Sequence, residues 1–116
     1  MRDLALQAAG ALAILVALAH GAIAELSVFP RARIEPEWAR RLLRMVFQAS
    51  TVDWIAVGVL LIATPALGSQ QLRPWIIAVA VVVYGYAAIG NALATRGRHF
   101  GWVLMGGVVA LALAGV

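Results

Sequence analysis

The chain has 116 residues, of which 64% are hydrophobic and only 12% charged, and its mean hydropathy is +0.94. A soluble domain is nearer half apolar and a quarter charged, and one of this size could not bury so much apolar surface. These values exclude an ordinary water-soluble fold and predict a single transmembrane domain over residues 1–116.

The net charge of +4 comes from nine Arg residues, with no Lys and no Cys in the chain. Most of these Arg residues flank apolar runs, so we ascribe them to orientation in a lipid bilayer and expect no nucleic-acid partner. The lack of Cys excludes disulfides, thiolate metal sites and Cys nucleophiles.

The first apolar run covers residues 4–26. It is long enough to cross a bilayer, which takes about 20 helical residues. The same run resembles a signal peptide that ends in a small-residue cleavage site at residues 22–24. We expect a retained span, because cleavage would leave the following Arg-rich segment outside the cell. Residues 27–35 are predicted to be a polar connector.

The second predicted helix runs from Pro36 to Pro65 and begins with an amphipathic segment at the membrane surface. Pro suits a helix start, because its missing N–H costs nothing there. Trp38 would anchor this segment among the lipid headgroups. Its arginines are expected to face lipid phosphate: Arg40, Arg41 and Arg44. The span itself is predicted over residues 44–65.

Two further spans are expected over residues 75–95 and 99–116, the third ending at a C-cap Gly97. The last run is just long enough to cross. The sequence therefore predicts an all-α integral membrane protein, a four-transmembrane-helix antiparallel bundle whose second helix is extended by an interfacial amphipathic segment. Small residues on the fourth span predict a packing face for another helix or another copy: Gly106, Ala110 and Ala114.

Orientation follows from the loops. Seven of the nine Arg residues lie between the first and second spans or between the third and fourth. Short Arg-rich loops stay in the cytoplasm. We therefore expect both of these loops to be cytoplasmic and both termini to lie outside, in a bacterial inner or plasma membrane.

Asp53 is the only acid deep within an apolar run, roughly 14 Å past Arg44 at the helical rise of 1.5 Å per residue. A charge at mid-bilayer costs about 2.5–3.5 kcal/mol, so Asp53 is expected to be protonated or to have a partner. His20, Asn91 and Tyr84 are estimated to lie roughly 9, 6 and 16 Å from the cytoplasmic side. We predict that these side chains form a transport or proton site in the cytoplasmic half, with Ser50 on the same side of its helix as Asp53.

Each of these residues also has a structural interpretation. Asp53 could be a buried neutral acid that holds helices together, and His20, Tyr84 and Asn91 could link helices through hydrogen bonds. A transport role for Asp53 is favoured because intramembrane ionisable groups are usually functional. The ordinary pKa of His, near 6.5, allows His20 to carry a proton.

Four functions are compatible with this pattern. The leading one is a small transporter or proton-linked permease, working as a homo-oligomer because four helices enclose little space. The alternative is a non-catalytic membrane subunit or scaffold that binds a larger membrane partner. A subunit with haem held by His20 and His99 is a third, opposed by their estimated depth difference of roughly 9 Å. The fourth is an enzyme, for which the chain offers no catalytic motif.

In length and number of spans the chain resembles the small multidrug resistance transporters. That family carries its key acid as a Glu mid-way along the first span. The first run here has no acid at that depth, so the resemblance transfers no function.

Overall fold

The computed structural model describes all 116 residues; 85% of them are helical and there are no strands, which confirms the all-α prediction. The helices follow in the order α1 (Arg2–Ile23), a π-helical turn η1 (Ala24–Val28), α2 (Phe29–Arg31), α3 (Glu37–Leu67), α4 (Leu72–Thr95) and α5 (Gly101–Ala114). Three helices are long and apolar enough to cross a membrane: the continuous helix from α1 through α2, α3, and α4.

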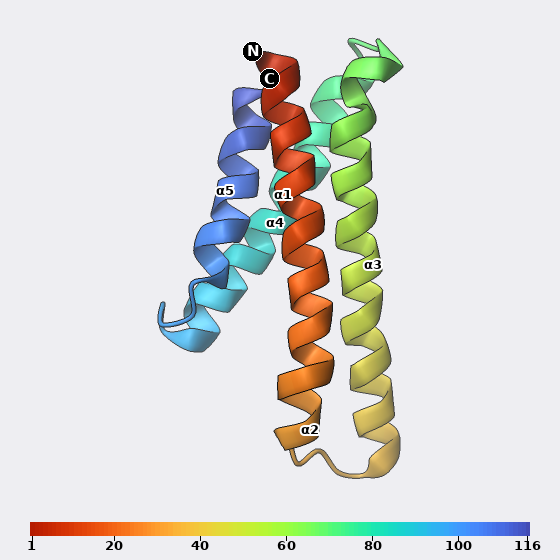
Figure 1. The fold of residues 1–116 in the computed structure, drawn as a ribbon, viewed down its shortest axis with the longest axis vertical. Helices are drawn as coiled ribbons and strands as arrows, with labels where there is room; N and C mark the ends of the chain where they lie inside the picture. The colour runs from red at the N-terminus through yellow and green to blue at the C-terminus, as the bar shows by residue number, and fades with distance from the viewer.

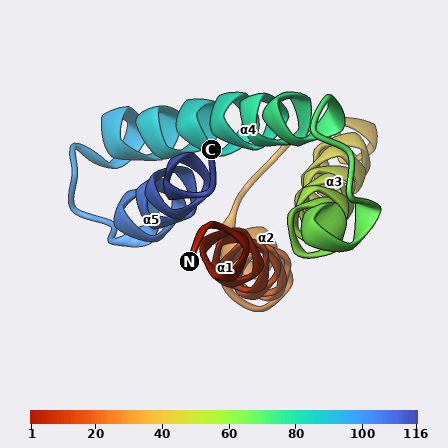
Figure 2. The same cartoon turned by 90° about the horizontal axis from the view of Figure 1, so that it is seen from above.

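Two helical hairpins make up the molecule (Figure 1). The α1–α2 helix and α3 lie side by side along most of their length, and α4 pairs with α5. Both termini and the α3–α4 turn lie at one end, where the hairpins meet, and toward the other end α4 and α5 diverge from α1. Figure 2 shows α4 crossing from the α3 side of the molecule to the α5 side.

The first helix is longer than predicted, because it continues through the expected polar connector to Arg31. Pro30 lies in this extension and would clash with the carbonyl four residues earlier in a regular α-helix. The π turn just before it is wider than an α turn. We infer that this wider turn accommodates Pro30 and lets the helix continue.

The end of α3 also differs from the prediction. The helix passes through Pro65 and ends at Gly68, whose φ is +61°. Pro65 lies in the last turn, where its missing N–H forfeits only one helical hydrogen bond. The left-handed Gly68, which carries no Cβ penalty, sets the end instead.

The second hairpin matches the sequence prediction at α4 but less well at α5. α4 ends at Thr95 as expected, followed by Arg96 and Gly97, both in the left-handed conformation. α5 covers only 14 residues, about 21 Å at the helical rise. It is thus shorter than the 99–116 span predicted, and shorter than a bilayer core of about 30 Å.

Glycines bring α1 and α3 into close contact. A Cβ added to Gly10 would lie 2.4 Å from the carbonyl oxygen of Gly58, and one added to Gly58 would lie 2.9 Å from that of Gly10. Along the same side of α1, Ala13, Ala17 and Ala24 are fully buried. Small residues of this kind allow membrane helices to pack backbone against backbone.

The small-residue face of α5 is not used inside the chain. Gly106 has no atom within 4 Å of an added Cβ, and Ala110 and Ala114 are exposed. α5 instead buries Met105, Val108 and Ala112 against the core. The role predicted for the Gly106–Ala114 face, contact with another helix or copy, stays a prediction.

Replacing Gly10 by Ala should destabilise the protein, because the new methyl group would press on the backbone of α3. We expect a cost of about 1–3 kcal/mol, the usual range for overpacking. Thermal unfolding followed by circular dichroism in detergent measures it. Gly85→Ala is the matched control: it has open space around it and should be neutral or stabilising by up to about 1 kcal/mol. Equal effects of the two substitutions would contradict the close contact.

Candidate functional site

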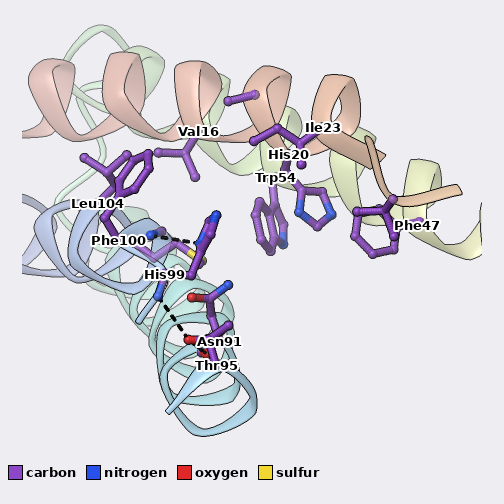
Figure 3. A pocket seen from close by; sticks show the side chains of 14 residues that line it. Val16, His20, Ile23, Phe47, Trp54, Asn91, Thr95, His99, Phe100 and Leu104 are labelled. Atoms are coloured by element: carbon purple, nitrogen blue, oxygen red, sulfur yellow. Dashed lines mark hydrogen bonds between the residues drawn. The ribbon is translucent and has the colours of Figure 1, made fainter. Parts of the chain in front are cut away.

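A pocket of about 240 Å³ lies between the two hairpins where they diverge. His20 of α1 and Phe47 and Trp54 of α3 line one wall. The opposite wall carries Asn91 of α4 and His99 of the α4–α5 loop. Figure 3 shows these polar and aromatic side chains pointing into the same space.

His20 is held in a defined orientation by α3. Its Nε2 lies 3.2 Å from Ser50 Oγ, and that hydroxyl donates its only hydrogen to the carbonyl oxygen of Phe47 at 2.7 Å. The neutral imidazole must therefore donate to Ser50 through Nε2, which leaves the Nδ1 lone pair free. The ring stacks on Phe47 at 4.2 Å between centroids and lies 4.5 Å from the Trp54 ring.

The second wall adds two further polar groups. Asn91 Oδ1 is buried and has no hydrogen-bond partner. His99 Nδ1 accepts a hydrogen bond from the Gly101 N–H at 3.2 Å, so the neutral ring carries its proton on Nε2. His20 Nδ1, Asn91 Oδ1 and His99 Nε2 thus each remain available to a bound group.

Tyr84 lies beyond the closed end of the pocket and joins three helices. Its side chain is fully buried. The single hydrogen of its hydroxyl is shared between the carbonyl oxygens of Ala13 on α1 and Trp54 on α3, each 3.1 Å from the hydroxyl oxygen. The Tyr84 and Trp54 rings are 5.4 Å apart, so Trp54 contacts both Tyr84 and His20.

Asp53 lies apart from this group. Its side chain is exposed, forms no hydrogen bond or ion pair, and does not line the pocket. Ser50 and Trp54 contact His20 instead. Ser50 and Asp53 differ by about 60° around the helix, and this is enough to place them on different sides of α3. The structure therefore brings His20 and Asn91 together, with Tyr84 just beyond, and leaves Asp53 outside.

His99 was not among the predicted transport residues. Counted at 1.5 Å per residue along helices perpendicular to a membrane, His99 and His20 differ in depth by roughly 9 Å. α4 and α5 are tilted, and the loop that carries His99 reaches the same pocket as His20. No local sequence motif could have indicated this.

Between the pocket and the loop that precedes α3, a row of polar contacts joins α3 to the end of α1 and its extension. Gln48 donates to the Gly21 carbonyl at 3.3 Å and to Glu25 Oε1 at 2.9 Å. Arg44 binds both carboxylate oxygens of Glu25, with Nε 3.0 Å from Oε1. Arg40 Nη2 donates to the Phe29 carbonyl at 2.7 Å. The contacts advance in steps of four along both helices, in opposite directions.

These contacts refine the predicted membrane-surface segment. Arg40 and Arg44 bind the neighbouring helix, where the sequence suggested lipid phosphate. Trp38 and Arg41 are exposed, and their contact with lipid headgroups stays a prediction.

At the end that holds both termini, hydrogen bonds from Arg73 connect the helices. Arg73 at the start of α4 donates from Nη1 to Asp3 Oδ1 at 2.7 Å and from Nε to the Gly115 carbonyl oxygen at 2.9 Å. One guanidinium thus connects the beginning of α1, the beginning of α4 and the segment after α5. Two further hollows lie toward this end: an open one of about 370 Å³ beside Asp3 and Arg73, and one of about 140 Å³ between α3 and α4, lined by Leu60 and Trp75.

No protein-family model, curated protein sequence or solved structure matches this chain. The defining features of the site are an imidazole with a free ring nitrogen, an unpartnered amide oxygen, and a pocket closed toward the termini.

Removing the Tyr84 hydroxyl should weaken the junction of α1, α3 and α4. We expect Tyr84→Phe to lower the free energy of unfolding by about 0.5–1.5 kcal/mol, the usual net value of one hydrogen bond. Chemical or thermal unfolding in detergent measures this. Tyr86→Phe removes the same atom from a side chain that is 82% exposed and should change stability little. A Tyr84→Phe protein as stable as the wild type would show that the junction does not depend on this hydroxyl.

Proposed function

We propose that the chain is an integral membrane protein that acts as a small transporter or proton-linked permease, with the pocket between the hairpins as its site. Its Arg-rich loops would face the cytoplasm and its termini the outside of a bacterial inner or plasma membrane, following the distribution of positive charge. The pocket then opens in the cytoplasmic half of the bundle.

One observation carries the proposal: a titratable imidazole with a free nitrogen lines a pocket that lies between two hairpins, on one side of a closed contact. Secondary transporters expose a site near the bilayer midplane to one side at a time, by rocking one helix bundle against another. The Tyr84 junction and the Arg73 contacts lie on the closed side of the pocket. Rocking about the Tyr84 junction would require the Arg73 contacts to separate.

The chemistry available in the pocket suits a proton. Protonation of His20 at Nδ1 would place a cation between the Phe47 and Trp54 rings, whose faces stabilise positive charge. Ser50 would continue to accept from Nε2, so the ring would keep its orientation when it gains the proton. Asn91 Oδ1 offers an acceptor that has no other partner.

The size of the pocket bears on what it carries. Sites for drug-sized molecules occupy about 300–1,000 Å³. This pocket measures about 240 Å³, and an open groove of about 590 Å³ adjoins it and shares His20, Trp54 and Asn91. The space is thus large enough for a proton, a small solute or a small organic molecule.

Proton flux into liposomes that contain the purified protein tests the proposal, with a trapped pH-sensitive dye and an imposed gradient. We expect wild-type flux above that of protein-free liposomes, and a loss of about tenfold or more in His20→Gln, because Gln retains hydrogen-bonding capacity but cannot carry the proton. Ile89→Ala, at an exposed position of α4 that lines neither the pocket nor the groove beside it, controls for the effect of substitution itself. Circular dichroism confirms folding of each variant.

The same assay on Asp53→Asn distinguishes His20 from Asp53 as the residue that carries the proton. Loss of flux in Asp53→Asn with His20→Gln unaffected would return the proton site to Asp53, as the sequence predicted. Wild-type flux no faster than that of empty liposomes, with the gradient imposed in either direction, would contradict proton-linked transport.

The alternative, a membrane subunit that binds a larger partner, is favoured by one observation. On the small-residue face of α5, Ala110 and Ala114 are exposed, and a Cβ added to Gly106 would meet open space. Membrane helices pack closely through such faces. Co-purification of a stoichiometric partner from native membranes, lost when Ala110 is replaced by Phe, would support this alternative.

A further inference from the structure

The outer side of α3 carries a regular seam that is exposed along most of its length, with α4 approaching it only near Leu60. Its residues alternate three and four positions apart: Val46, Ala49, Asp53, Ala56, Leu60 and Ala63. All are exposed except Ala63, which is partly exposed. The opposite side of the same helix packs against α1 through Gly58 and Leu61, so α3 has two separate packing faces.

This spacing is that of a helix pair. A repeat of 3.5 residues keeps one stripe facing a partner helix in a left-handed supercoil. In the α3 seam, Ala occupies every second position of the stripe, and the larger Val46, Asp53 and Leu60 occupy the others. Small residues allow close approach of membrane helices, and the larger ones can fill the spaces between.

Asp53 lies in the middle of the seam and determines what can cover it. It makes no hydrogen bond or ion pair within the chain and does not line the pocket. Acids within membrane spans almost always face protein or a water-filled cavity, since exposure to lipid is unfavourable. A lipid-facing Asp53 would be an exception, so we expect a protein surface over the seam.

We propose that a second copy of the chain docks along α3, with the two α3 helices parallel and the two Asp53 side chains in contact. A two-fold axis along the membrane normal places each residue at the same depth as its counterpart. The position that Asp53 occupies in the repeat contacts its own equivalent in a parallel pair. In such a pair, the surface that covers each Asp53 contains the Asp53 of the other copy, which is a polar group at the same depth.

The two carboxyl groups are chemically suited to each other. When two carboxyls share a site, one of them retains its proton, and the protonated group can donate a hydrogen bond to the other. A single polar residue at such a position also fixes register and favours a pair over larger assemblies. This dimer rests on α3 crossing a membrane and is independent of transport.

The chain has no Cys, so a single introduced Cys can form a disulfide only with the same residue of another copy. Single variants Ala49→Cys and Ala56→Cys are purified, reconstituted in liposomes and oxidised, and the disulfide-linked dimer is measured on a non-reducing gel. Since each position would meet its counterpart, we expect a yield about tenfold above that of Val82→Cys, on the exposed side of α4. Dilution with Cys-free protein should lower the yield in proportion. Equal yields at all three positions would overturn the proposal.

A second measurement tests the acid pair itself. In the Ala56→Cys background, Asp53→Asn should retain the cross-link, because two amides can bond to each other, and Asp53→Leu should reduce it by about fivefold or more, because a Leu side chain has no preference for protein over lipid. Circular dichroism establishes that each variant folds. A yield unchanged in Asp53→Leu would overturn the role of the acid, whatever the proton-flux assay shows. A cross-link that requires added membrane extract would indicate a different partner helix and overturn the self-association.

Discussion

The hydroxyl of Tyr84 joins the two hairpins at the level where they begin to separate. It reaches from α4 to carbonyl oxygens on both α1 and α3. A polar group buried among apolar helices must find a partner, because an unsatisfied one is costly. The helices cannot separate at Tyr84 without losing these hydrogen bonds, whereas beyond it they can diverge. The pocket therefore begins where this constraint ends.

The first hairpin is held by two different kinds of interaction along its length. In its apolar part, Gly10 and Gly58 bring the backbones together, and no polar side chain is needed. Nearer the Arg-rich loop, Glu25, Gln48 and Arg44 hold the helices through hydrogen bonds and an ion pair. This change follows the composition of the hairpin, whose apolar part is succeeded by a part rich in charged side chains. It also explains why the first helix continues into polar sequence.

The sequence predicted the positions of the long helices well, but it did not predict which side of each helix is buried. Apolar runs bounded by Pro, Gly and Arg indicated the all-α fold and the positions of the long helices. The length of α5 and the continuation of α3 through Pro65 depend on helix tilt and capping. Neither of these can be read from the composition of the segments. His20 and Asn91 stood out in the sequence because polar side chains are rare in such runs, and the structure places both in one pocket. Asp53 was misplaced relative to Ser50 because a helix that is apolar on every side gives no periodic signal for its buried face.

The π turn at Ala24–Val28 has a consequence for how the first helix tolerates change in length. Ala24 and Phe29 are both buried, five residues apart, a spacing that fits one π turn and not one α turn. The extra residue thus keeps both side chains facing α3. Deleting one residue here would leave Ala24 and Phe29 four positions apart, the spacing of one α turn, so both could keep their facing while the helix shortens by about 1.5 Å. The turn thus accommodates one additional residue between α1 and the segment that leads into the Arg-rich loop.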